Sequence, residues 1–169
     1  MNEILERFFQ NRSTNYVRSN KHFQLFETKL LLDIKSTYNK QTELHKNLPS
    51  FLFEKKNWDI VTYNESGHID TAIEVKQIPS FNQNKQRKNR IQEALGQVCD
   101  ARAVNPNVKF AYFLIIQNNR IYTPGIIEAL EKLEMYYDVV GYILIENDKI
   151  LENNLNEALD ELYYDSLCN

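Results

Sequence analysis

The most informative stretch of the chain is residues 58–76, which read WDIVTYNESGHIDTAIEVK. Two runs rich in β-branched and aromatic residues flank a polar turn, so we expect an antiparallel hairpin. Because side chains alternate faces along a strand, Asp59, Glu74 and Lys76 share one face, and the apolar residues on either side of Glu74 point into a core. The hairpin therefore places two carboxylates and an ammonium together on otherwise apolar strands.

The length of the turn decides how the two carboxylates face each other. If the turn comprises residues 64–67, Asp59 lies opposite Ala72 and diagonal to Glu74. If it tightens to residues 66–67, Asp59 lies directly opposite Glu74. Both registers stay open at this point, and both keep the carboxylates on one face.

Two interpretations of this charged face compete. Like charges held near a core repel each other unless a cation lies between them, and Mg²⁺ prefers oxygen ligands. Lys76 would then orient a water molecule or stabilise charge on a phosphate oxygen. The alternative is an edge hairpin whose acids face solvent, with Lys76 as a cross-strand salt bridge.

The surrounding residues favour the first interpretation. The segments that decide this are KNWDIV at residues 56–61, AIEVKQ at residues 72–77 and RIQEALGQ at residues 90–97. Together they resemble the PD-(D/E)xK nuclease superfamily and, within it, type II restriction endonucleases of the XhoI group. The resemblance covers about residues 56–100, and it departs from the motif in that Asp59 follows Trp58 instead of proline.

The resemblance implies a fold, a metal and a reaction. The fold is a restriction-endonuclease-like α/β arrangement, a mixed sheet flanked by helices. Asp59 and Glu74 would bind Mg²⁺, and Lys76 would assist the water that hydrolyses a phosphodiester bond. Some members take an extra acidic ligand from an N-terminal helix, which makes Glu27 a candidate ligand and Glu43 a second one. The alternative for both is a solvated acid on a helix.

Candidate DNA-binding residues follow the second strand directly. Amide and basic side chains can neutralise phosphates and read base edges. The candidates are Asn82, Asn84, Lys85, Arg87, Lys88 and Arg90, together with Gln97 on the expected active-site side of a helix at residues 88–103. The alternative is a solvated loop and helix start.

Composition and charge set limits on the class of protein. The 169 residues fit a single domain, residues 1–169, and 43% hydrophobic with 25% charged residues is ordinary for a soluble protein. No apolar run is long enough to span a membrane, and two distant cysteines favour the reduced cytoplasm. The net charge is −3, but residues 1–102 hold 16 Lys and Arg against 12 Asp and Glu. A polyanion would therefore approach through the first two-thirds of the chain.

The remaining pattern predicts a strand–helix–strand unit with parallel strands. Helices are expected at residues 2–11, 20–37, 126–136 and 154–167, and strands at residues 51–53, 109–116 and 139–145. Residues 38–49 are expected to be a polar connection.

These features lead to three hypotheses. The first is a Mg²⁺-dependent type II restriction endonuclease that cuts double-stranded DNA as a homodimer. The second is a structure-selective nuclease, such as a Holliday junction resolvase or a repair nuclease, which would make many phosphate contacts and few base contacts. The third is a non-catalytic DNA-binding domain of the same fold.

Overall fold

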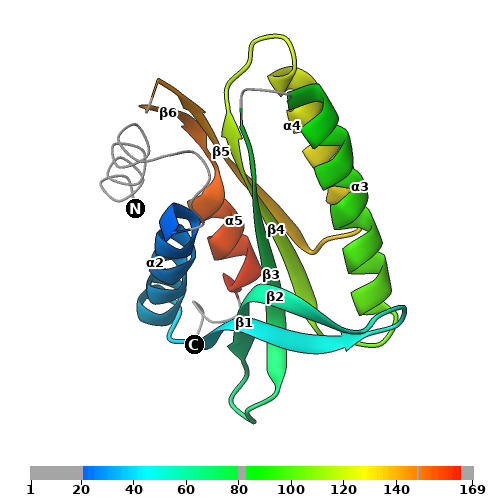
Figure 1. Cartoon of the computed structure of the whole chain (residues 1–169). Coiled ribbons are helices and arrows are strands. Elements are labelled where there is room, and N and C mark those ends of the chain that lie inside the picture. The colour runs from blue at the N-terminus through cyan, green and yellow to red at the C-terminus, as the bar shows by residue number, and fades with distance from the viewer. Residues whose placement is uncertain (1–20, 80–82, 148, 165–169) are drawn as a thin grey trace.

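The structure, a computed structural model, describes residues 21–79, 83–147 and 149–164, so the helix predicted at residues 2–11 lies outside it. The elements in chain order are α2 (Lys21–Thr37), β1 (Gln41–Ser50), β2 (Glu54–Tyr63), β3 (Ile69–Ile78), α3 (Gln83–Arg102), β4 (Lys109–Gln117), α4 (Thr123–Leu133), β5 (Val139–Glu146), β6 (Lys149–Asn153) and α5 (Leu155–Leu162). Figure 1 shows one twisted sheet with helices on both sides. None of these helices is long and apolar enough to cross a bilayer.

The strands form a single six-stranded sheet in the order β1-β2-β3-β4-β5-β6. The first three strands are antiparallel neighbours, β3, β4 and β5 are parallel, and β6 is antiparallel to β5. Both parallel connections are crossovers, through α3 and α4. Because such crossovers are right-handed and the sheet grows in one direction, both helices fall on the same face. The predicted mixed α/β sheet with flanking helices is confirmed.

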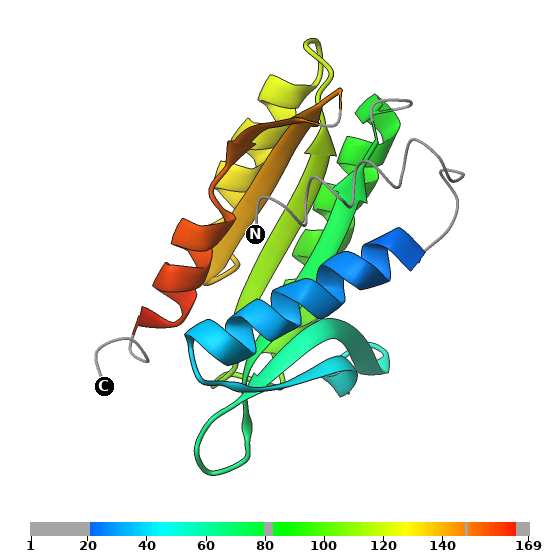
Figure 2. The same ribbon diagram turned by 90° about the vertical axis from the view of Figure 1, so that its left-hand side faces the viewer.

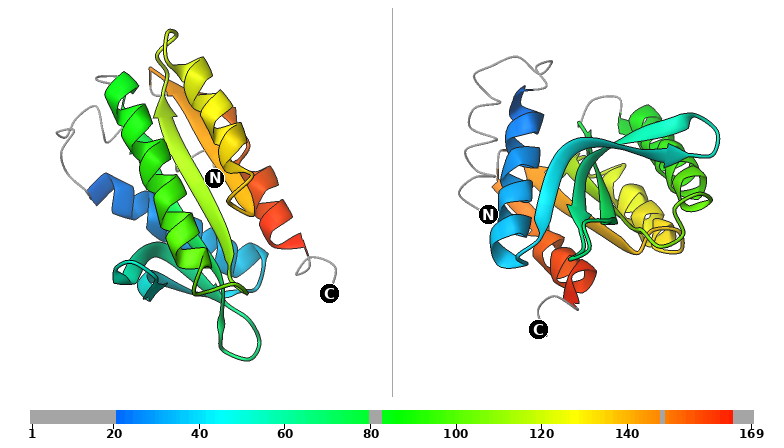
Figure 3. Two further views of the ribbon diagram at one scale, coloured as in Figure 1. Left: turned by 90° about the vertical axis from the view of Figure 1, so that its right-hand side faces the viewer. Right: turned by 90° about the horizontal axis from the view of Figure 1, so that it is seen from below.

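A hydrophobic core fills each side of the sheet. Helices α2 and α5 cover one face, as Figure 2 shows. Phe26 and Leu30 belong to the same core cluster as Ile73 and Val75. Helices α3 and α4 cover the other face, as the left-hand view of Figure 3 shows. Ile73 and Val75 are the two apolar neighbours of Glu74, and their predicted place in a core is confirmed. Glu74 therefore lies on the face that α3 covers.

The central strand of the sheet is β4, as its apolar sequence predicted. Residues 110–116 are all buried, because helices cover this strand on both faces and strands flank it on both edges.

Three predictions about the elements are wrong. Residues 38–49 are not a connection, because residues 41–50 form the edge strand β1, whose outward side chains are polar. Residues 51–53 are the turn between β1 and β2 and not a strand. Helix α3 begins at Gln83 instead of residue 88, so most of the predicted DNA-contacting segment is helical. The short strand β6 was not predicted at all.

The β1–β2 hairpin passes from the hydrophobic core on one face of the sheet to the core on the other face. His45 has a positive φ of 53°, and the pairing of the two strands skips it between Leu44 and Lys46. Before this point Ile60 packs in the core under α2, and beyond it Trp58 packs in the core under α3. The hairpin thus extends from beside α2 toward α3, as the right-hand view of Figure 3 shows.

Candidate active site

The candidate site lies where β2 separates from β3. Ladder pairing between the two strands ends at Ile60 and Ile73, which places Asp59 at the position facing Glu74. One oxygen of the Asp59 carboxylate accepts a hydrogen bond from the backbone N–H of Val75 at 2.8 Å. The side chain thus satisfies a backbone donor that would otherwise lack a partner where the ladder ends. The opening between the strands is therefore built into the fold.

The register is the second one considered above, with Asp59 opposite Glu74, although the turn spans residues 64–68 and is not tightened to residues 66–67. Thr62 pairs with Thr71 but Tyr63 pairs with Ile69, so Asp70 is an extra residue in β3. This bulge combines the wider turn with the register that brings Asp59 opposite Glu74.

Glu74 is the most deeply buried charged group of the site, with an exposed fraction of 0%. Lys76 contacts one of its oxygens, and the Nζ of Lys56 lies 2.9 Å from the other. Lys76 also reaches Asp59, with 3.5 Å between Nζ and Oδ2. Lys56 lies in the part of β2 that no longer pairs with β3, and its ammonium lies over the Trp58 ring. Two lysines thus share one buried carboxylate.

A third carboxylate lies near this group, on the helix that covers the opposite face of the sheet. Glu27 on α2 is 2% exposed, and its Oε2 lies 3.7 Å from Nε2 of His45. Burial raises the pKa of Glu27 to about 7, and the nearby carboxylate of Asp59 adds to the rise. Glu74 acts in the same direction and Lys76 against it. Burial and the neighbouring carboxylates together therefore raise the pKa of Glu27 in spite of Lys76.

Burial and the same neighbours also shift the pKa values of Glu74 and Lys76. Burial raises the pKa of Glu74, and Asp59 raises it further, against the effect of Lys76 and Lys56. Burial alone would lower the pKa of Lys76, but the carboxylates of Glu74 and Asp59 outweigh it and the pKa is raised. Lys76 therefore stays protonated at neutral pH and supplies a fixed positive charge. A cluster with this much mutual perturbation is typical of functional sites, although structural ion pairs also produce it.

The cluster has the donors for a hard divalent cation. Glu27, Asp59 and Glu74 offer carboxylate oxygens, and their repulsion would be relieved by a cation of charge +2. In the described part of the chain, no three His, Cys, Asp or Glu side chains are placed so as to hold a metal ion together. In this arrangement Lys56 and Lys76 occupy the oxygens of Glu74. Binding a cation here therefore requires the carboxylates to move closer together and a lysine to give way.

Helix α3 lines the site on the face of the sheet where Glu74 lies. Arg90 and Glu93 pair at 2.8 Å, and Glu93 accepts a hydrogen bond from Gln97 at 3.1 Å. Glu93 helps to raise the pKa of Lys76, so this side of the helix faces the cluster. The Tyr112 hydroxyl below is buried without a hydrogen-bond partner among the described residues.

The predicted DNA-binding residues are spread around α3. Lys85 and Arg90 line a cleft of about 410 Å³ together with Glu93, on the side of the cluster. Arg87 and Lys88 line a separate cleft of about 360 Å³ against α4. Asn84 is exposed at the start of the helix, and Asn82 lies outside the described residues. The segment therefore does not form a single surface, because a helix turns successive side chains by about 100°.

The structure separates the two additional acid candidates. Glu27 lies in the cluster, whereas Glu43 is on the exposed face of β1, where it pairs with Lys46 at 3.1 Å and accepts a hydrogen bond from Tyr63. Sequence reasoning missed Lys56. No spacing signals this residue, because it reaches Glu74 from the part of β2 beyond the last pair with β3.

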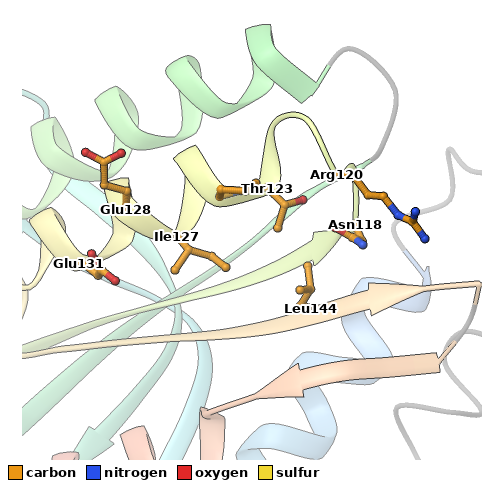
Figure 4. A pocket seen from close by; sticks show the side chains of 8 residues that line it. Asn118, Arg120, Thr123, Ile127, Glu128, Glu131 and Leu144 are labelled. Atoms are coloured by element: carbon orange, nitrogen blue, oxygen red, sulfur yellow. The ribbon is translucent and has the colours of Figure 1, made fainter.

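A further cavity, of about 510 Å³, lies away from this cluster at the start of α4. Figure 4 shows its lining, and none of the cluster residues contributes to it. Its walls include Thr123, Ile127 and Leu144.

The fold and site thus define an α/β protein with a buried carboxylate–lysine cluster where two strands diverge. Comparison of the chain with protein-family models, with curated proteins and with solved structures gives no match.

Proposed function

We propose that the protein is a Mg²⁺-dependent endonuclease that hydrolyses phosphodiester bonds of double-stranded DNA. The observation that carries this proposal is the contact of Lys76 with both Asp59 and Glu74, with Glu27 of α2 near enough for their charges to shift its pKa. The resemblance described above implies the same four side chains, with an acid from an N-terminal helix among them. A salt-bridged edge hairpin would leave its acids in solvent, whereas Glu74 is fully buried.

Glu27, Asp59 and Glu74 would hold the Mg²⁺ ion. The cation would polarise the scissile phosphate and increase the acidity of the attacking water. A cation held by Glu74 would release the ammonium groups of Lys56 and Lys76, which would stay beside it.

Lys76 would act on the phosphate and on the attacking water. The water oxygen would form a bond to phosphorus and lose a proton to the solvent, while the bond between phosphorus and one sugar oxygen breaks and that oxygen takes up a proton from the solvent. Negative charge grows on the phosphate oxygens as this happens, and the ammonium of Lys76 would stabilise that charge. The buried position of the cluster strengthens this interaction by excluding water.

The DNA would approach along α3 and the basic two-thirds of the chain. Lys85 and Arg90 lie on the side of α3 that faces the cluster, where they would neutralise phosphates. Among nucleases, we propose a type II restriction endonuclease that acts as a homodimer, because cutting both strands of a palindromic site requires two such clusters related by a two-fold axis.

Digestion of sequence-diverse linear duplex DNA tests this proposal. With Mg²⁺ we expect discrete fragments, and with EDTA we expect none. Smeared products, or cutting confined to added four-way junctions, would favour a structure-selective nuclease and contradict the restriction assignment. DNA binding without any cutting would contradict nuclease activity and favour the non-catalytic domain.

A further inference from the structure

The tip of the β1–β2 hairpin exposes three consecutive large apolar side chains. Phe51 is 70% exposed, Leu52 is 68% exposed and Phe53 is 76% exposed. Contiguous apolar side chains on a surface are unfavourable in water and mark a place of interaction.

The tip is held rigidly. The buried carboxylate of Asp100 on α3 accepts a hydrogen bond from the hydroxyl of Ser50, and another from the backbone N–H of Leu52 at 2.6 Å. The Ser50 hydroxyl in turn accepts one from the N–H of Phe53 at 3.3 Å. Glu54 then leaves the turn with a positive φ of 64°. The apolar side chains thus project from a braced turn that is fastened to a helix.

We propose that this tip, residues 51–53, is a wedge that inserts between base pairs of DNA next to the bond that is cut. The inference rests on the proposed function, because it names how the substrate of that same site is held. Apolar wedges of Phe and Leu are a general means of unstacking a base step, and aromatic rings stack on any base.

Charge around the tip favours DNA over a protein partner. Residues 45–57, the distal part of the hairpin, contain three lysines and one glutamate. A stable protein interface takes about 800 Å² from each partner, and three side chains at the end of a hairpin provide only part of that area. The space between two adjacent base pairs is small enough for the tip to fill.

Continuity with the cluster fixes where the wedge would act. Lys56 contacts Glu74 and follows Phe53 by three residues, a distance of about 10 Å along a strand. Nucleotides in a strand are spaced by about 3.4 Å, so the unstacked step would lie a few nucleotides from the scissile phosphate. Unstacking there would let the phosphate backbone bend toward the buried carboxylates.

Two sets of variants test the wedge. The first replaces Phe51, Leu52 and Phe53 together by serine, and its control replaces the equally exposed Ile121 and Met135 by serine. The probe is a mixture of sequence-diverse duplexes in excess, with Ca²⁺ in place of Mg²⁺, and affinity is measured by fluorescence anisotropy. We expect binding about 10- to 100-fold weaker for the tip variant and unchanged for the control.

The second set reports stacking directly. Emission from a Phe53→Trp variant should be quenched when the duplexes are added, whereas emission from Met135→Trp should not. Trp58 is buried and is the only natural tryptophan, so it adds a constant background.

Three outcomes would overturn the wedge. They are equal DNA affinity of the tip variant and the control, no quenching at Phe53→Trp, and loss of a dimer in sedimentation when the tip is replaced, which would make the tip a contact between two copies of the chain. Cleavage in Mg²⁺ is scored separately. Quenching without cleavage would uphold the wedge and contradict the proposed nuclease. Cleavage without quenching would uphold the nuclease and contradict the wedge.

Discussion

Replacing Glu74 by glutamine is expected to lower the rate of DNA cleavage by about 10³-fold or more. Glutamine preserves the shape of the fully buried side chain but removes the charge that a divalent cation needs. It also removes the acid that holds both Lys56 and Lys76 in place. The measurement is the single-turnover rate in Mg²⁺ for the wild type and the variant.

Asp70→Asn is the matched control for this substitution. Asp70 lies on the same strand and pairs with Lys40 at 2.9 Å, but it is outside the cluster. We expect the Asp70 variant to cleave at close to the wild-type rate. Equal rates for the Glu74 variant and the wild type would show that the cluster is structural and contradict its proposed role.

Replacing Glu27 by glutamine is expected to stabilise the protein at pH 8 by up to about 3 kcal/mol, with little effect at pH 5. The folded state raises the pKa of Glu27 from 4.5 to about 7, so it favours the protonated side chain. This preference stabilises the fold fully below pH 4.5 and is lost as the pH rises through 7. Glutamine resembles the protonated acid, so the variant keeps at pH 8 the folding stability that the wild type has lost.

Urea unfolding at the two pH values measures this difference. Glu43→Gln is the control, because ion pairing and the hydrogen bond from Tyr63 lower the pKa of Glu43 and its charge contributes to stability above its unfolded pKa. The Glu43 variant should therefore gain no folding stability at pH 8. A gain for Glu27→Gln that is equal at both pH values would mean that burial and the neighbouring carboxylates do not raise the pKa of Glu27.

The part of the site that depends on strand periodicity was predictable. Asp59, Glu74 and Lys76 come together because alternation and a short hairpin leave little freedom. Glu27 was named through the resemblance, and the spacing of its helix only placed it near the apolar side. The register of the hairpin was not predictable, because it depends on the bulge at Asp70.

The rest of the site depends on features that have no local signature. Strand β1 escaped prediction because an edge strand has a polar outer face and contains Pro49, which is tolerated only at an edge or a bulge. Phe51 and Phe53 were expected in a strand because apolar runs are normally buried, yet they project from the hairpin tip. Lys56 reaches Glu74 from the part of β2 beyond the last pair with β3. The residue at which two strands stop pairing is set by tertiary contacts.

The central claim is that Glu27, Asp59 and Glu74 hold one divalent cation beside Lys76. Anomalous scattering from crystals grown with Mn²⁺ above pH 7 tests this claim most directly, because Mn²⁺ takes the same oxygen ligands as Mg²⁺ and can be located by its signal. We predict a peak between the three carboxylates, with Lys56 displaced from Glu74. A map without a peak there, in which both lysines still hold Glu74, would contradict it.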